Sequence, residues 1–243
     1  MIKLFRKIRR NLLIKNKIRT YLKYAIGEII LVVIGILIAL QINNWNEDRK
    51  LQKEEIRILN NLQVDLQQTL IELESALVFH QKTITEIDKI EHYIKNKIPY
   101  SEAIESSFGI LPHYYVALIT SSSYTSLQSI GVGIIKNNKL KDLLINTYDV
   151  ALADILDYNA DEFQLQTTLV TPFFSKNFRY MDKSLYHAKP NNYDDLIDNE
   201  EFLNILSIVK RTRKKGIERY NDIIAFLQTT IEAIQNELEL RDP

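Results

Sequence analysis

One apolar stretch near the N-terminus constrains this chain more than any other feature. Every residue from 29 to 40 is apolar, and the wider span 21–42 contains only three charged or strongly polar residues, Lys23, Glu28 and Gln41. About 20 predominantly apolar residues in a helix cross the hydrocarbon core of a bilayer. We therefore predict that residues 21–44 form a single transmembrane helix, with the rest of the chain on either side of it.

The charges that flank this stretch predict its orientation. Residues 1–24 contain nine bases and no acid, whereas residues 45–57 mix four bases with four acids. Basic flanks stay on the cytoplasmic side, so we expect a cytoplasmic N-terminus and an extracytoplasmic bulk of the chain. A cleaved signal peptide is the alternative, but a small-x-small cleavage site is missing after the apolar run. An uncleaved signal anchor is favoured.

The amino-acid composition limits the fold and the functions expected for the part of the chain that follows the anchor. The chain has 31 bases and 31 acids; removing the nine N-terminal bases and Glu28 leaves 22 bases and 30 acids in residues 45–243. Such an acidic body is not expected to bind nucleic acid. The absence of cysteine excludes disulfides, thiolate metal sites and cysteine catalysis. Six glycines and five prolines favour long helices.

The N-terminal segment, residues 1–20, is predicted to form a basic amphipathic tail. Apolar residues recur at helical spacing, and between them lie Lys3, Arg6, Lys7, Arg9 and Arg10. Such a helix suits the anionic inner leaflet of the membrane. Alternatively, these bases only set the topology of the anchor.

The predicted membrane helix carries a candidate contact face. Gly35 and Ala39 form a small-xxx-small pair that permits close approach of a second helix, and Glu28 falls on the same face. This face is predicted to contact another copy of the chain or a membrane partner. The alternative is that Glu28 reaches the headgroup layer and the glycine is incidental.

A heptad pattern follows the membrane stretch. Residues 36–98 contain neither glycine nor proline, and apolar residues dominate the positions 59, 63, 66, 70, 73, 77, 80, 84, 87, 91, 94 and 98. This 3.5-residue period predicts a coiled coil or antiparallel bundle helix over 45–98, ending at Pro99. His80 is interpreted as a buried polar residue that fixes its register.

Further helices are predicted from caps and breakers. Serines 121–123 and Gly131 bracket a short helix, and Asn137 or Asn138 begins one that Pro172 ends. Residues 173–198 are expected to be a loop with a short helix. The last helix runs from Asp198 or Asn199 to about residue 240, with a bend at Gly216. The predicted fold is all-α: a transmembrane helix continuing into, or followed by, an antiparallel helical domain at 45–243.

The chemistry-bearing residues do not form a recognisable catalytic or metal motif. The four histidines lack ligand spacing. Four acids, Asp154, Asp157, Asp161 and Glu162, approach metal-ligand spacing, but carboxylates on a solvated helix face account for them equally well. We therefore expect no enzyme activity, cofactor or metal. The basic run Lys210, Arg211, Arg213, Lys214 and Lys215 is a candidate docking patch for a partner; its alternative is a solvated helix face.

Two blocks of the sequence resemble a known family. The run from Tyr24 to Glu47, YAIGEIILVVIGILIALQINNWNE, resembles the N-terminal signature of DUF6090, a family of uncharacterised membrane proteins common in Bacteroidota. The later block SYTSLQSIG, residues 123–131, is similar to that family's second block, although members more often have a serine–glycine pair where this chain has Ile130-Gly131. The resemblance implies an inner-membrane protein and supplies no catalytic residue.

Together these features predict a membrane-anchored scaffold or interaction protein that contacts itself or another membrane or periplasmic protein. The alternative is a periplasmic helical bundle that senses a ligand and signals through a membrane partner.

Overall fold

The computed structural model describes residues 18–180 and 186–241. The predicted amphipathic tail, with Lys3, Arg6, Lys7, Arg9 and Arg10, lies outside the described residues. Contacts divide the chain into two units, residues 1–55 and 56–243. Helix α2 (Ile18–Lys95) contributes residues to both units, so the predicted membrane helix and the helix after it belong to one α-helix.

The described part of the first unit is helical and exposes its apolar side chains. The large apolar residues between 29 and 40 are each 47–64% exposed. This helix is the one in the described chain that is long and apolar enough to cross a membrane. An isolated helix with apolar side chains all round is not stabilised by water, and it suits a hydrocarbon environment.

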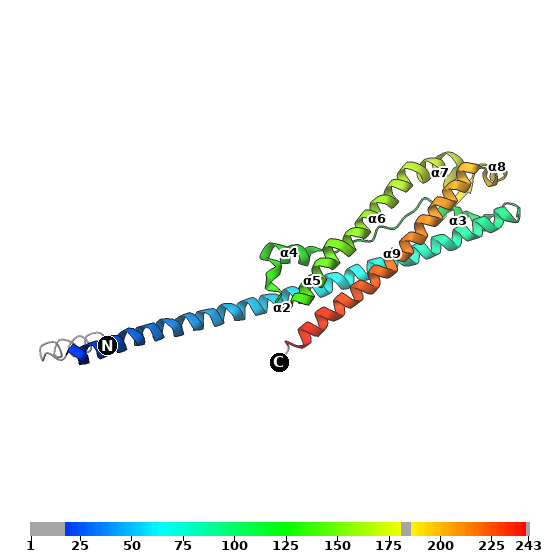
Figure 1. Cartoon of the computed structure of the whole chain (residues 1–243). Coiled ribbons are helices and arrows are strands. Elements are labelled where there is room, and N and C mark those ends of the chain that lie inside the picture. Colours follow the sequence, from blue (N-terminus) through cyan, green and yellow to red (C-terminus); the bar gives the residue numbers. More distant parts are fainter. Residues whose placement is uncertain (1–17, 181–185, 242–243) are drawn as a thin grey trace. The chain divides into compact units, whose positions relative to one another are not determined.

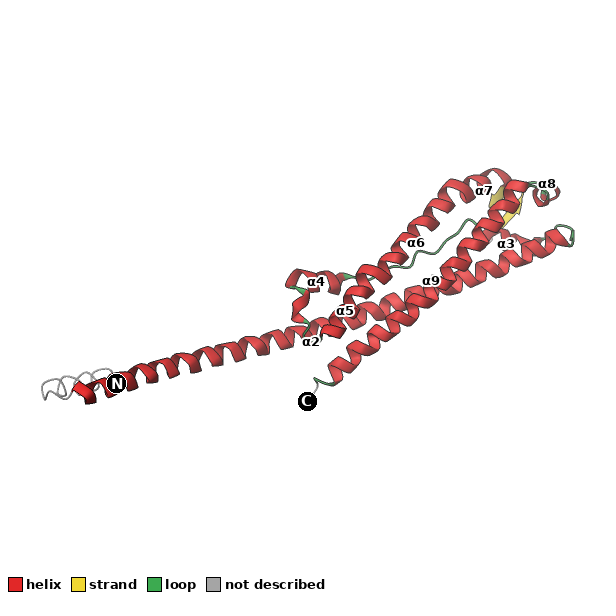
Figure 2. Cartoon of the chain, in the orientation of Figure 1, coloured by secondary structure: helices red, strands yellow, loops and turns green. Residues whose placement is uncertain are grey.

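The second unit is almost entirely helical (Figures 1 and 2). After α2 the order of elements is η1 (Glu102–Ile104), α3 (Glu105–Ile110), α4 (Ser122–Ile130), η2 (Val132–Ile134), α5 (Asn138–Asn146), η3 (Thr147–Ala151), α6 (Leu152–Leu165), η4 (Gln166–Val170), α7 (Thr171–Asn177), β1 (Phe178–Tyr180), β2 (Ala188–Pro190), α8 (Tyr193–Ile197) and α9 (Glu200–Glu239). The predicted all-α fold is confirmed, with one short hairpin as the exception.

Three long helical segments form the bundle: α2, the segment α5–α7, and α9 (Figure 1). Lys210, early in α9, contacts Asp88 and Glu91 late in α2. Thr230, late in α9, bonds Thr147, early in the second segment, at 3.0 Å. Helix α9 therefore runs antiparallel to both other segments, as predicted for an antiparallel bundle.

An extended return segment, residues 112–121, connects α3 to α4. The backbone N–H of Thr120 donates to Thr69 Oγ1 of α2 at 3.1 Å, and Asn159 of α6 donates to the Ala117 carbonyl at 3.3 Å. The segment thus lies against both α2 and α6. Side-chain donors and acceptors on these helices replace the strand partners that an extended backbone normally requires.

The return segment explains why the predicted seam of α2 is half wrong. The buried positions include 59, 62, 66, 69, 73, 76, 80, 83, 87 and 90, so every second predicted position is displaced by one residue. Small side chains, Thr69, Ala76 and Thr83, take the places predicted for Leu70, Leu77 and Ile84. A small side chain permits close approach of the neighbouring backbone, which the hydrophobic pattern does not report.

Helix boundaries follow the predicted caps more closely than the predicted breakers. Asn137 caps α5 by accepting from the N–H groups of Lys139 and Leu140, and Asn199 caps α9 by accepting from Phe202. Helix α2 ends at Lys95, before Pro99, and Lys97 adopts a positive φ of 47°. The bounds predicted for the short helix at 122–130 are confirmed.

Pro172 does not end its helix, contrary to the prediction. It lies in the first turn of α7, directly after the π-helical turn η4. Proline has no N–H to donate to a helical hydrogen bond, and the π-helical turn before it, in which the Thr171 N–H donates to the Gln166 carbonyl five residues back, already departs from the α-helical pattern at this point. The helical segment continues to Asn177. Helix α9 likewise runs through Gly216 as one α-helix; the bend predicted there stays a prediction.

A two-stranded hairpin replaces part of the predicted loop at 173–198. Strands β1 and β2 pair antiparallel, with Phe178 opposite Pro190. His187, just before β2, places Nε2 2.6 Å from the buried carboxylate of Glu105 on α3. Gly109 of α3 leaves room for this approach, because a Cβ there would lie 2.8 Å from the His187 Cα.

Two apolar clusters form the core of the second unit, one toward each end of the three long segments. The first includes Leu59, Leu66, Ile155, Leu227 and Ile234, and the second includes Ile87, Phe174, Phe202 and Val209. On each long segment the change from one cluster to the other falls at buried polar residues: His80 and Thr83, Glu162 and Gln166, and Arg213. A polar layer therefore separates the two clusters.

Candidate functional site

The polar layer is centred on a buried ion pair. Arg213 of α9 contacts the carboxylate of Glu162 of α6, and both side chains are 0% exposed. The guanidinium also donates to the His113 carbonyl at 2.8 Å and lies over the Phe79 ring, 5.5 Å from its centroid. These contacts join α9 to α6, the return segment and α2 at one level of the bundle.

Aromatic and imidazole groups complete the layer. The Tyr158 hydroxyl donates to Glu162 Oε1 at 2.9 Å and lies 2.8 Å from His80 Nε2. The Tyr220 ring packs edge-on against His80, with centroids 5.1 Å apart. Gly216 permits this packing, since a Cβ there would overlap both the His80 ring and the Tyr158 hydroxyl. The glycine serves close helix packing.

The electrostatics of the layer are those of a structural network. Burial, assisted by the positive charge of Arg213, lowers the pKa of His80 to about 3, so the imidazole is neutral at pH 7. Burial lowers the pKa of Arg213 to about 10, which leaves the guanidinium charged. A general acid or base works best with a pKa near the operating pH, and neither group meets that condition. The layer can fix how the helices pair, because each buried polar group needs its partner.

The basic run predicted as a docking patch is divided by the helix. Lys210 pairs with Asp88 at 2.7 Å and Glu91 at 2.6 Å, and Arg213 points into the core. Arg211, Lys214 and Lys215 are exposed. Successive side chains of a helix point about 100° apart, so a run of consecutive bases surrounds the helix. The interpretation of Arg213 as a surface residue is therefore wrong.

The acidic residues on α6 are also distributed over different surroundings. Glu162 is buried in the layer, Asp154 lies 3.6 Å from Arg219, and Asp157 and Asp161 are exposed. Among the described residues no group of three or more histidines and carboxylates is placed to hold a metal ion. The interpretation of all four acids as a solvated face is wrong for Glu162.

The candidate membrane contact face lies in the first unit. Gly35 and Ala39 are exposed, and Glu28 is partly exposed. A Cβ added at Gly35 would meet nothing within 4 Å. The role predicted for Glu28, Gly35 and Ala39 in contacting a second helix stays a prediction.

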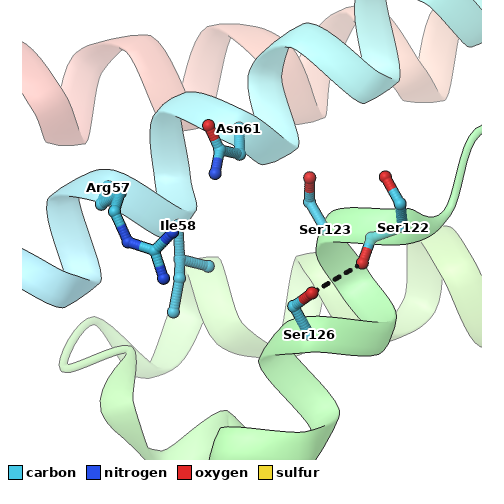
Figure 3. Close-up of a pocket in the computed structure, with 6 residues that line it drawn as sticks. All are labelled: Arg57, Ile58, Asn61, Ser122, Ser123 and Ser126. Atoms are coloured by element: carbon cyan, nitrogen blue, oxygen red, sulfur yellow. Dashed lines mark hydrogen bonds between the residues drawn. The ribbon is translucent and has the colours of Figure 1, made fainter.

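A cavity of about 220 Å³ lies where α4 approaches α2 (Figure 3). It is lined by Arg57, Ile58 and Asn61 of α2 and by Ser122, Ser123 and Ser126 of α4. Asp65, beside it, accepts from the Ser122 hydroxyl at 3.1 Å and from the Ser123 N–H at 2.8 Å. This carboxylate already occupies the positive end of α4, so the cavity does not offer that helix terminus to an anion.

A larger groove of about 520 Å³ opens between the return segment, α4 and α6. Its walls are mainly apolar and include Leu118, Ile119 and Leu156. Tyr124 and Tyr148 stack at one side with centroids 4.2 Å apart, and the Tyr124 hydroxyl donates to Asp149 at 2.9 Å. The volume is that of a small-ligand site. The sequence did not predict it, because its residues come from segments that are distant along the chain.

A comparison with known protein families gives a match over most of the chain. A model of the family of unknown function DUF6090 matches residues 28–213. The chain belongs to the DUF6090 family. The matched range begins in the apolar stretch of α2 and ends at Arg213, so it includes most of α2, the whole segment α5–α7 and the first 14 residues of α9. Neither the curated proteins nor the solved structures contain a match to this DUF6090 member.

Proposed function

We propose that this protein is a single-pass protein of a bacterial inner membrane whose extracytoplasmic helical domain acts as a scaffold or protein-interaction component, without catalysis. The observation that carries the proposal is the exposed apolar stretch 29–40 of α2. An exposed apolar surface of this size in water would be a strong aggregation liability, whereas in a bilayer it is stabilising.

The orientation rests on charge. Nine bases and no acid precede the apolar stretch, and this asymmetry retains the N-terminus in the cytoplasm. Residues 45–243 would then lie in the periplasm.

Support for a scaffold comes from the polar layer. Its ion pair is held by three helices and the return segment, and its His80 has a pKa far below neutral. These properties suit a domain whose shape is fixed so that a partner can recognise its surface. The expected partners are the lipid bilayer and either a second copy or another membrane or periplasmic protein; nucleic acid is not among them.

Membrane fractionation tests the anchor. Wild-type protein in native membranes should resist extraction by alkaline carbonate, and Ile34→Asp with Leu37→Asp should release a large fraction of it. Val150→Asp is the matched control, because Val150 is 62% exposed on the helical domain. Complete extraction of the wild-type protein would contradict the proposal.

The groove between α4 and α6 favours a second function, namely ligand sensing that is transmitted through a membrane partner. Its buried Tyr148 hydroxyl lacks a hydrogen-bond partner. A ligand bound there should raise the melting temperature of the full chain in detergent, and Leu118→Glu should abolish the increase. Leu118 is 66% exposed, so this substitution should leave the fold intact.

A further inference from the structure

The outer face of α2 in the second unit carries a regular apolar stripe. Between residues 56 and 95, the exposed large apolar side chains are Val64, Ile71 and Val78, which are 63%, 55% and 62% exposed. They are spaced by seven residues, and each lies opposite the buried seam: Val64, for example, stands midway between buried Leu62 and Leu66. A position opposite the seam is ordinarily the most polar of a heptad.

The residues beside the stripe are mostly uncharged. The residues three or four positions from a stripe residue, which are its nearest neighbours on the helix surface, are Asn60, Asn61, Gln67, Gln68, Glu74, Ser75, Gln81 and Lys82, of which only two are charged. On α9, by contrast, nine of the 18 exposed residues are charged. Depletion of charge around apolar residues marks the core of a protein interface more than a solvated face.

We propose that this stripe is a self-association surface, at which α2 of one copy pairs with α2 of a second copy through Val64, Ile71 and Val78. Apolar residues spaced by seven along one helix match a partner helix with the same spacing. The α2 helix of a second copy carries the same exposed stripe and therefore has this spacing. The face has no strong charge of one sign, so two copies meet without repulsion.

The membrane anchor would hold two copies close together and in the same direction, and in this respect the inference rests on the proposed function. The stripe from Val64 to Val78 is about 21 Å long at 1.5 Å per residue, which is short for a stable coiled coil in solution. Copies anchored in one bilayer leave it in the same chain direction and at a raised effective concentration. A parallel contact that is weak in solution is then sufficient to pair two anchored copies.

Cysteine cross-linking in native membranes tests the surface, and the chain has no cysteine of its own. Single variants Val64→Cys, Ile71→Cys and Val78→Cys should each give an oxidised dimer at about five times the yield of Val150→Cys and Leu156→Cys. The two control positions are 62% and 54% exposed and lie on other elements. Equal yields at all five positions, or no dimer at the stripe, would overturn the proposal.

A second variant separates this surface from other contacts. Ile71→Glu should reduce cross-linking at positions 64 and 78 at least about fivefold while the melting temperature stays within about 2 °C, because the side chain is exposed. Val150→Glu should leave cross-linking unchanged. Undiminished cross-linking in Ile71→Glu would overturn the proposal. Protein that remains in the membrane without stripe cross-links overturns this inference alone; protein absent from the membrane fraction overturns both it and the proposed anchor.

Discussion

Arg213 and Glu162 form an ion pair from which solvent is wholly excluded. The two residues come from α9 and α6, and the pair lies at the level where both helices pass from one apolar cluster to the other. A buried pair adds little net stability, because desolvation of the two charges offsets their attraction. Its consequence is that an alternative helix register would leave a charge buried without its partner.

Removal of one residue of the Arg213–Glu162 ion pair should lower the stability of the domain. Arg213→Met leaves the Glu162 carboxylate buried without its cation, and the free energy of unfolding should fall by about 3–5 kcal/mol. The double variant Arg213→Met with Glu162→Leu should recover most of that loss, since neither charge remains. Urea unfolding of the full chain in detergent measures both. A single variant within about 1 kcal/mol of wild type would show that the pair does not constrain the bundle.

Acid should destabilise the domain partly through His80. Its pKa is about 3 in the folded protein, whereas an exposed histidine in the unfolded chain has a pKa of about 6.5. The unfolded state therefore binds an additional proton as the pH falls from 6.5 toward 3, and stability is lost over that window. Between pH 7 and pH 5 the loss from this residue should be about 2 kcal/mol.

His80→Gln isolates that contribution, because the other titrating groups are common to both proteins. The free energy of unfolding of the variant should fall less steeply with acid than that of wild type. Parallel pH curves for the two proteins would be evidence against the neutral buried imidazole.

Gly216→Ala should destabilise the domain although alanine is the better helix former. Alanine gains about 1 kcal/mol in helix propensity, but its Cβ would overlap His80 and Tyr158. Overpacking of a filled core costs about 1–3 kcal/mol, so a net loss of about 1 kcal/mol is expected. Gly133→Ala is the matched control, because a Cβ there meets nothing within 4 Å. A Gly216→Ala protein as stable as the control would contradict the close approach of α9 to His80 of α2 and Tyr158 of α6.

Asp65 should hold α4 in place. Asp65→Ala removes the acceptor of the Ser122 hydroxyl and of the Ser123 N–H, and a lost cap costs about 0.5–2 kcal/mol. Amide hydrogen exchange in the first turn of α4 should accelerate more than in α9. Asp157→Ala, at an exposed site on α6, should change neither helix. Uniform acceleration across both helices would instead indicate a global effect of Asp65.

Local signals predict much of this fold. The apolar stretch, the helix caps at Asn137 and Asn199, and the end of α4 at Gly131 each depend on residues close in sequence, and the structure confirms them. The burial predicted for His80 is also confirmed, because its position on the apolar seam of α2 turns the imidazole toward the core.

The remaining features depend on contacts between distant segments. Arg213 looks like part of a surface charge run until Glu162 is placed beside it, and the heptad pattern of α2 omits Thr69 because its acceptor role involves the return segment. The groove at Tyr148 is assembled in the same way from separate elements. Periodicity reports which face of a helix is apolar, and it does not report which neighbour covers that face.

Accessibility to a membrane-impermeant thiol reagent tests the central claim most directly. In intact spheroplasts, full-length Lys214→Cys should be labelled, since Lys214 is exposed on the helical domain, and Lys7→Cys should be labelled only after lysis. The cysteine-free wild-type chain gives the background. Labelling of position 7 but not position 214 in intact cells would contradict a cytoplasmic N-terminus and an extracytoplasmic helical domain.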